Sequence, residues 1–185
     1  MLSNLNNFDH AIFEFLRPQG NDLDELMRLI SSEEIWLAIL FFVVCWAAYR
    51  KSFQTLKKLG LALVIMGLTD AVCFNLLKPT FERYRPCYQM QELDLRQKKC
   101  GGYYGFPSNH ASNGAAFATS LLLLFPGVKA LRLVMAVPLA VGYSRIYIGV
   151  HYPGDVVAGF LFGALFSWLL VVVWRFGQMK FKVHR

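Results

Sequence analysis

The sequence predicts an all-α integral membrane protein: a helical bundle of about five transmembrane helices, preceded by an amphipathic interfacial region. Hydrophobic residues make up 56% of the 185-residue chain, more than the roughly 45–50% of a soluble domain. Lys and Arg residues cluster at the ends of apolar runs, as in membrane proteins. The length fits a single domain. We divide it into an interfacial region at 1–33, a transmembrane core at 34–176 and a basic tail at 177–185.

The net charge of +7 raises the question of nucleic-acid binding. The charges stand at the ends of apolar runs and do not form the continuous basic face that such binding requires. We therefore expect membrane lipids as partners and no nucleic acid. The sequence does not indicate an oligomeric state.

Residues 8–30 predict two short amphipathic helices separated by Pro18 and Gly20. Neither is apolar enough to span a bilayer, so we expect a helix pair that lies along the membrane surface. The alternative is a loosely ordered soluble tail, because short isolated helices are marginally stable in water. The apolar positions at helical spacing are Phe8, Ile12, Phe15, Leu16, Leu23, Leu26, Met27 and Ile30.

A bilayer core of about 30 Å needs roughly 20 apolar residues in a helix. A shorter helix at about 110–125 is rich in small residues, which let helices approach closely in lipid. Gly159 and Gly163 have the spacing of a helix-packing motif, which is a weak indication by itself. The four longer apolar runs are 35–49, 59–77, 133–150 and 156–174.

Five crossings would bring four helix ends to one membrane face: the end of the second helix, the start of the third, the end of the fourth and the start of the fifth. Polar motifs stand at those places. The two faces carry ten and nine Lys and Arg residues, so the counts barely differ. We assign the opposite face to the cytoplasm, so that the motifs face outward, because Lys78, Arg85 and Arg145 belong to the motifs and an acidic cluster from Asp22 to Glu34 lies on the motif side. The basic residues of that cytoplasmic face are Arg50, Lys51, Lys57, Lys58, Lys129, Arg132, Arg175, Lys180, Lys182 and Arg185.

Three polar segments make up the motif face. They are Lys78 to Arg85-Pro86, then Phe106-Pro107-Ser108-Asn109-His110, then Ser144-Arg145 with His151 and Asp155 downstream. Lys78, Arg85 and Arg145 can neutralise a phosphate, and each Arg adds a planar fork that meets two oxygens. Ser108 before a helix start adds backbone N–H groups and the positive end of the helix dipole.

His151 and Asp155 are spaced so that the carboxylate can fix the imidazole in one tautomer and leave its other nitrogen to attack phosphorus. His110 can then protonate the leaving oxygen. We expect no metal and no other cofactor, because no acidic cluster is present and cations back the histidines. Singly, these residues have plainer interpretations: a surface histidine, a snorkelling cation, a packing serine at Ser144. Together they favour a phosphate site, and the flanking apolar runs indicate a lipid phosphate.

The three motifs resemble the signature of the type 2 phosphatidic acid phosphatase (PAP2) superfamily. That signature is Lys, six residues, Arg-Pro; then Pro-Ser-Gly-His; then Ser-Arg, five residues, His, three residues, Asp. The chain departs from it at Asn109, where the family has Gly; Asn also tolerates a left-handed backbone. The family's soluble vanadate-dependent haloperoxidases lack such apolar runs, so that branch is not expected.

The resemblance implies a phosphohistidine mechanism without a metal. His151 would be the nucleophile, Asp155 its orienting partner, and His110 the acid and later the base. The implied phosphate ligands are Lys78, Arg85, Ser108 and Arg145, with the backbone amides of Asn109 and His110.

Three functions follow as hypotheses. The first is a lipid phosphatase of a bacterial cytoplasmic membrane, with its active site at the outer face. Its substrate would be undecaprenyl pyrophosphate, phosphatidylglycerol phosphate, phosphatidic acid or a lipid A phosphate. The second is a non-catalytic protein that binds a lipid headgroup or passes an anion. The third is a phosphotransferase that shares the first half-reaction.

Two further features lie near the motifs. Cys87 and Cys100 share the loop between the first two segments, where an oxidising compartment would allow a disulfide. The spacing alone leaves the disulfide open. Asp70 lies within the second apolar run and needs a polar partner, for which we favour a structural hydrogen bond over a catalytic role.

Overall fold

The computed structural model describes residues 2–18, 20–49, 51–90, 93, 95–96 and 99–183. These residues are mostly helical. They contain no β-strand, only an isolated β-bridge between Tyr84 and Tyr104. The α-helices are α1 (Leu2–Leu16), α2 (Asp24–Ser31), α3 (Glu33–Tyr49), α4 (Phe53–Val72), α5 (Lys78–Phe81), α6 (Pro86–Gln89), α7 (Asn109–Leu124), α8 (Ala136–Tyr147) and α9 (Pro153–Val183). A π-helix at Cys73–Leu77 joins α4 to α5, and a 3₁₀ helix at Lys129–Met135 precedes α8.

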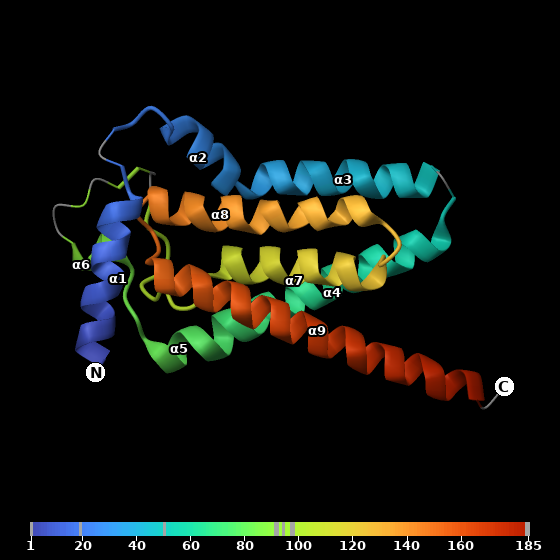
Figure 1. Cartoon of the computed structure of the whole chain (residues 1–185). Helices are drawn as coiled ribbons and strands as arrows, with labels where there is room; N and C mark the ends of the chain where they lie inside the picture. The colour runs from blue at the N-terminus through green and yellow to red at the C-terminus, as the bar shows by residue number, and fades with distance from the viewer. Residues whose placement is uncertain are drawn as a thin grey trace.

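The long helices form an elongated bundle. In Figure 1, α3, α4, α7, α8 and α9 run along its length, and α1 crosses one end. Two segments of the described chain, Phe53–Phe81 and Pro153–Met179, are long and apolar enough to span a membrane, and α2 with α3 would add a third across a 47° bend. The predicted helical membrane architecture is confirmed at this level. Five crossings stay a prediction, since α7 and α8 have only 16 and 12 residues.

Two of the expected helix boundaries differ from the structure. The run expected at 133–150 begins as a 3₁₀ helix and its α-helical part ends at Tyr147. Gly149, with φ of +85°, then turns the chain toward α9. The tail expected from residue 177 continues α9 to Val183. Three residues used in the charge assignment or the predicted tail lie outside the described part of the chain: Arg50, His184 and Arg185.

Small residues bring α7 and α9 into backbone contact. A Cβ atom at Gly163 would lie 2.1 Å from the carbonyl oxygen of Ser112, and one at Gly159 would lie 2.7 Å from that of Ser108. Ala111 and Ala115 of α7 are fully or almost fully buried. Because Gly159 and Gly163 have no side chain, α9 can lie directly against α7, and the second and third motifs come together.

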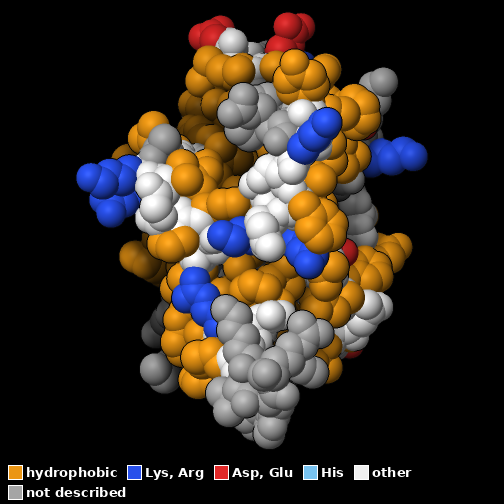
Figure 2. Space-filling view, turned by 90° about the vertical axis from the view of Figure 1, so that its right-hand side faces the viewer, with side chains coloured by type: hydrophobic (Ala, Val, Ile, Leu, Met, Phe, Trp, Pro, Cys, Tyr) orange, Lys and Arg blue, Asp and Glu red, His pale blue; other side chains and the backbone are white. Residues whose placement is uncertain are grey.

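The end of the bundle opposite α1 carries basic residues among apolar ones (Figure 2). Lys51 and Lys57 lie at the α3–α4 connection, Lys129 and Arg132 in the 3₁₀ helix, and Arg175 in the last part of α9. All five are exposed. These five residues lie at the end of the bundle away from the motifs, while the motif end carries Lys and Arg residues of its own, such as Lys78, Arg83 and Arg145.

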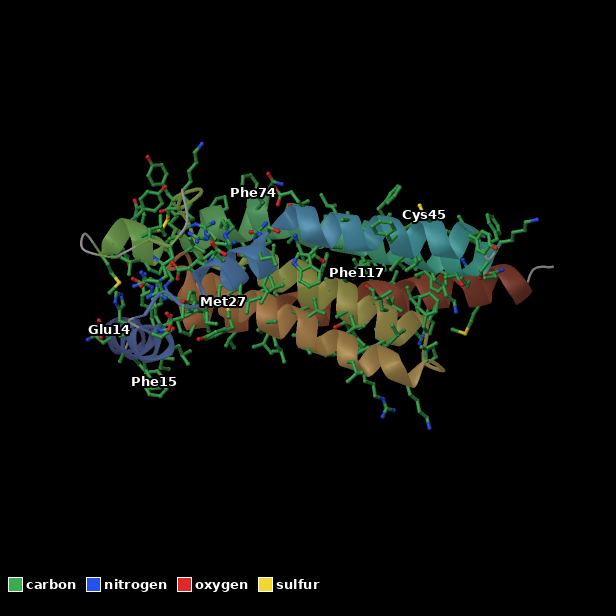
Figure 3. All side chains as sticks on the ribbon, turned by 90° about the horizontal axis from the view of Figure 1, so that it is seen from above. Glu14, Phe15, Met27, Cys45, Phe74 and Phe117 are labelled. Carbon is green, nitrogen blue, oxygen red and sulfur yellow. A yellow bond between two sulfur atoms is a disulfide. The ribbon has the colours of Figure 1, made fainter. Side chains whose placement is uncertain are left out.

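The N-terminal region forms two amphipathic helices that pack against the bundle. Their place at a membrane surface stays a prediction. On α1, Phe13 is buried against the bundle, whereas Phe8 and Phe15 are 66% and 86% exposed. Figure 3 shows Phe15 directed away from the bundle. Met27 of α2 is buried beside Tyr147. Both helices therefore cover the end of the bundle where the motifs lie.

Candidate active site

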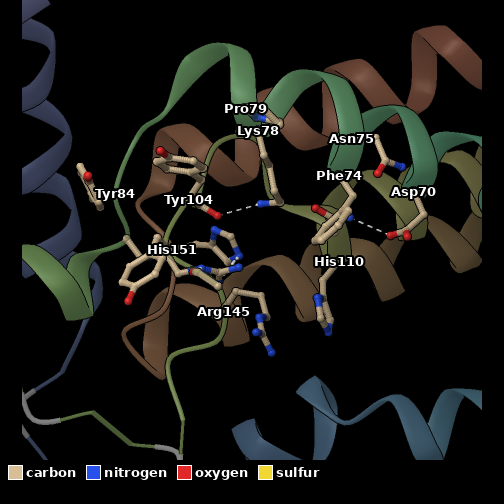
Figure 4. Close-up of a pocket in the computed structure, with 14 residues that line it drawn as sticks. Asp70, Phe74, Asn75, Lys78, Pro79, Tyr84, Tyr104, His110, Arg145 and His151 are labelled. Atoms are coloured by element: carbon tan, nitrogen blue, oxygen red, sulfur yellow. Dashed lines mark hydrogen bonds between the residues drawn. The ribbon is translucent and has the colours of Figure 1, made fainter.

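The three motifs meet at the α1 end of the bundle. Lys78 begins α5, Ser108 precedes α7, and Asp155 lies in the first turn of α9. They surround a cavity of about 760 Å³, shown in Figure 4. Its lining residues are Asp70, Phe74, Asn75, Lys78, Pro79, Tyr84, Arg85, Gly102, Tyr103, Tyr104, Asn109, His110, Arg145 and His151.

His151 is held from both sides of its ring. Nδ1 lies 3.3 Å from Oδ2 of Asp155, and Nε2 lies 2.9 Å from an Nη atom of Arg85. Because a guanidinium only donates, Nε2 is the acceptor and Nδ1 carries the proton. Burial, with the charges of Arg85 and Arg145, lowers the pKa of His151 well below its ordinary value. The imidazole is therefore neutral near pH 7, with its lone pair toward the cavity.

Asp155 stands behind His151 and does not line the cavity. Its side chain is completely buried, and Oδ2 also accepts a hydrogen bond from the amide of Tyr152, at 3.0 Å. A Cβ atom at Gly105 would lie 2.9 Å from the same oxygen, so the absence of a side chain there leaves room for the carboxylate. Asp155 lies where a residue that orients His151 should lie.

Lys78 organises the loop before α7. Its Nζ donates to the carbonyl oxygens of Tyr104, Gly105 and Pro107 at 3.1, 3.2 and 2.9 Å. An ammonium group has three protons, so these contacts use all of its donors. Lys78 still lines the cavity. Its contribution to phosphate binding would therefore be its charge more than a direct hydrogen bond.

Arg85 is held by residues that follow the loop between Cys87 and Cys100, and these two cysteines form a disulfide. Its Nε donates to the carbonyl of Gly102 at 2.7 Å, and its backbone amide donates to the carbonyl of Tyr103 at 3.2 Å. The disulfide left open by the sequence is thus present in the structure. It closes the loop that carries Arg85 against the segment that holds its guanidinium.

The start of α7 offers hydrogen-bond donors. Ser108 is completely buried, and within the described chain its Oγ has no hydrogen-bond partner. Its backbone amide donates to the carbonyl of Asp155 at 3.0 Å, which ties the second motif to the third. A buried hydroxyl beside a helix N-terminus can donate to an anion, but Ser108, like Asp155, is not among the residues that line the cavity.

Asn109 is the first residue of α7 and has a helical backbone, so the tolerance of Asn for a left-handed conformation is not used. Its side chain donates to Oδ1 of Asp70 at 2.7 Å, and Asn113 donates to the same oxygen at 2.7 Å. The structural hydrogen bond favoured for Asp70 is confirmed. The side chain of Asn109 faces Asp70, so its backbone N–H is the group that a phosphate could use.

Arg145 and His110 complete the lining. Arg145 comes from the last turn of α8 and is 8% exposed. It donates to Oγ of Ser31, the last residue of α2. His110 lies in the first turn of α7, and Figure 4 shows its side chain near that of Arg145. The structure therefore brings all eight candidate residues to one end of the bundle.

Sequence reasoning missed one group of residues at this site. Arg83 bridges Asp155 and Asp9, which come from α9 and α1. Asp9 carried no signal beyond its place on an amphipathic helix, and Arg83 only its closeness to Arg85. The aromatic lining from Phe74, Tyr84, Tyr103 and Tyr104 was also not predicted.

Residues 58–179 match the family model of the PAP2 superfamily. The chain belongs to the PAP2 superfamily. It is 37% identical to a lipid A 1-phosphatase of Rhizobium etli, over 95% of this chain and 81% of that protein. It is 32% identical to an undecaprenyl-diphosphatase of Sulfolobus acidocaldarius, over 94% and 82%.

A solved structure gives the same result for the fold. The transmembrane PAP2-type phosphatidylglycerolphosphate phosphatase from Bacillus subtilis superposes with a TM-score of 0.68 at 27% identity, over 92% of this chain and 86% of that one. These PAP2 relatives are lipid phosphatases with different substrates, and the family supports a phosphatase activity here.

Proposed function

We propose that this PAP2 protein is a membrane lipid phosphatase that acts through a phosphohistidine at His151. The observation that carries the proposal is the placement of the His151 ring. Its Nδ1 faces Asp155 and its Nε2 faces Arg85, in a cavity that His110 and Arg145 also line. A neutral imidazole with a fixed tautomer and a cation beside its lone pair is suited to in-line attack on a phosphate.

The reaction would proceed in two steps. Nε2 of His151 forms a bond to phosphorus while the bond from phosphorus to the lipid oxygen breaks, and His110 protonates that oxygen. Water then attacks the phosphorus of the phosphohistidine, His110 takes a proton from it, and phosphate leaves. Lys78, Arg85 and Arg145 stabilise the negative charge on the transferring group. Ser108 and the backbone amides of Asn109 and His110 add hydrogen bonds at the start of α7.

The proposed reaction requires a lipid substrate with a phosphate or diphosphate headgroup. The names of the relatives point to lipid A phosphate, undecaprenyl diphosphate and phosphatidylglycerol phosphate, and phosphatidic acid offers the same chemistry. Phe74, which lines the cavity, is 62% exposed, and Phe81 is 56% exposed. Acyl or prenyl chains could therefore remain in the bilayer while the headgroup enters the cavity.

We place the protein in a bacterial cytoplasmic membrane as a single domain with five crossings and the cavity at the outer face. The basic residues at the opposite end support this orientation, because positive charges favour the cytoplasmic side. The site needs no metal in this mechanism. Within the described residues, no group of three or more His, Cys, Asp and Glu could hold a metal ion.

The test is phosphate release from these four lipids by the purified protein in detergent with a chelator present. We expect release from at least one lipid, and loss of that release in His151→Ala with unchanged thermal unfolding. Phosphate release by His151→Ala would refute the nucleophile. Binding without release would indicate a lipid-binding protein, and transfer to an added lipid or sugar acceptor would indicate a phosphotransferase.

A further inference from the structure

Arg83 joins two carboxylates from opposite ends of the chain. Its Nη1 lies 2.8 Å from Oδ1 of Asp155, and its Nη2 lies 2.5 Å from Oδ2 of Asp9. The other oxygen of Asp9 accepts a hydrogen bond from the amide of Gly154, at 2.8 Å. A continuous polar chain therefore runs from α1 through Arg83 to the first turn of α9.

The contact with Arg83 restricts the orientation of the Asp155 carboxylate. Oδ2 of Asp155 faces His151, and Oδ1 on the other side of the carboxylate is held by Arg83. A completely buried carboxylate needs compensating charge and hydrogen bonds. With Oδ1 fixed, the plane of the carboxylate is fixed, and so is the direction in which Oδ2 meets the imidazole.

Arg83 is itself held on several sides. Its guanidinium carbon lies 4.6 Å from the centre of the buried Tyr152 ring, and its carbonyl accepts the amide of Gly105 at 2.7 Å. Asp9 occupies the end of the guanidinium away from Asp155. A planar fork that meets two carboxylates at once is a geometry that Lys cannot reproduce.

We propose that Arg83 is a positioning residue that sets the orientation of Asp155, and through it that of His151, while Asp9 of α1 holds Arg83 in place. This inference rests on the proposed phosphatase function. Arg83 is absent from the cavity lining, so its effect should fall on the chemical step and leave substrate binding unchanged. The surface helix α1 thereby becomes part of the support of the nucleophile.

The plainer alternative is that Arg83 only fastens α1 to the bundle. In that case Asp9→Ala should be at least as damaging as Arg83→Gln, because it removes the contact of α1 with Arg83 and also that with the amide of Gly154. If Arg83 positions Asp155, then Arg83→Gln is the more damaging change to kcat, since Arg83 contacts the carboxylate of Asp155 directly and Asp9 does not.

The experiment compares four proteins in steady-state phosphate release: the wild type, Arg83→Gln, Asp155→Asn and the double variant. We expect Arg83→Gln to lower kcat about tenfold to hundredfold, as when the outer-shell partner of a metal-binding histidine is lost. KM should stay within about twofold, as expected for loss of a transition-state contact. The double variant should be no slower than Asp155→Asn, because Arg83 has then lost the group it positions.

Two further measurements separate positioning from a general loss of folding. Added guanidinium should restore part of the activity of Arg83→Ala, because Arg83 is 19% exposed and the space can be reached from solvent. Arg132→Ala, at the opposite end of the bundle, is the matched control and should keep wild-type activity. The inference would be overturned if Arg83→Gln kept the wild-type kcat. It would also be overturned if the fold-decrease in kcat of the double variant equalled the product of the two single fold-decreases.

Failure of the proposed function would look different. If the wild type releases no phosphate from any lipid, the phosphatase proposal is refuted. Thermal unfolding of the same four proteins then tests whether Arg83 supports Asp155. If Arg83 holds Asp155, the decreases in Tm of the single variants sum to more than the decrease in the double variant. Additive decreases would show that the two residues do not support each other.

Discussion

The guanidinium of Arg85 lies 2.9 Å from Nε2 of His151, so the cation that attracts a phosphate and the atom that attacks it are in direct contact. A phosphoryl group drawn to Arg85 arrives next to Nε2 of His151, and Arg85 must release that nitrogen before its lone pair can attack phosphorus. The same Nη1 of Arg85 also donates to the carbonyl oxygen of Val150 at 3.3 Å, and Nε donates to that of Gly102 at 2.7 Å. Binding and nucleophilic attack are thus coupled through one side chain.

Arg85→Lys should therefore be a damaging substitution. Lys keeps the charge but loses the planar fork and the contact with Gly102. A charge-assisted hydrogen bond contributes about 1.5–3 kcal/mol, so we expect kcat/KM to fall by roughly tenfold to hundredfold. Steady-state phosphate release measures this. A Lys variant with wild-type kcat/KM would show that Arg85 acts only as a point charge.

The pH dependence of the reaction should report the environment of His151. Its pKa is lowered by burial and by neighbouring cations, first among them Arg85. The neutral, nucleophilic form therefore persists below the ordinary pKa of 6.5, and the acidic limb of kcat/KM should lie below that pH. Removing the positive charge in Arg85→Gln relieves repulsion of the imidazolium, which raises the pKa and moves the limb to higher pH.

The comparison uses one substrate for both proteins, so that ionisation of the substrate phosphate contributes equally to each profile. An acidic limb that does not move, or that moves to lower pH in Arg85→Gln, would contradict the assignment of that limb to His151.

The sequence was sufficient to place the motifs because helical crossings constrain which loops share a face. Lys78, Ser108 and Asp155 are far apart in the chain, yet each stands at the end of an apolar run. Backbone periodicity and bilayer thickness then bring them together. The spacing of Gly159 and Gly163 indicated a helix interface, because small residues let helices approach closely in lipid, and the structure shows that the helix they contact is α7.

The connections among these residues could not be predicted in the same way. Nothing in the pattern around Lys78 indicates that it donates to three carbonyls, because loop conformation decides that. The bridge from Asp9 through Arg83 to Asp155 depends on how α1 packs across the end of the bundle. That packing is a tertiary property with no periodic signal in a single sequence.

The disulfide between Cys87 and Cys100 should support the position of Arg85. For a loop of this size a disulfide contributes about 3 kcal/mol, so changing both cysteines to Ser should lower Tm and reduce kcat/KM. Cys45→Ser is the control, since that free thiol is exposed in α3. Thiol titration of the denatured protein should find Cys45 and Cys73 before reduction and all four cysteines after it. Four thiols before reduction would disprove the bond.

The contact of α7 with α9 predicts a position where one methyl group is harmful. In Gly163→Ala the new Cβ would lie 2.1 Å from the carbonyl oxygen of Ser112, so the helices must separate. Overpacking of this kind costs about 1–3 kcal/mol, which corresponds to a decrease in Tm of at least about 2 °C. Activity should fall as well, because α7 carries His110 and α9 carries Asp155.

Gly177→Ala is the matched control in the same helix. It has no atom within 4 Å of the new Cβ, and Ala favours helix more than Gly does. This variant should therefore keep both its Tm and its activity. If Gly163→Ala unfolds at the wild-type temperature with full activity, then the two helices do not need their close approach, and the alignment of the second and third motifs has another cause.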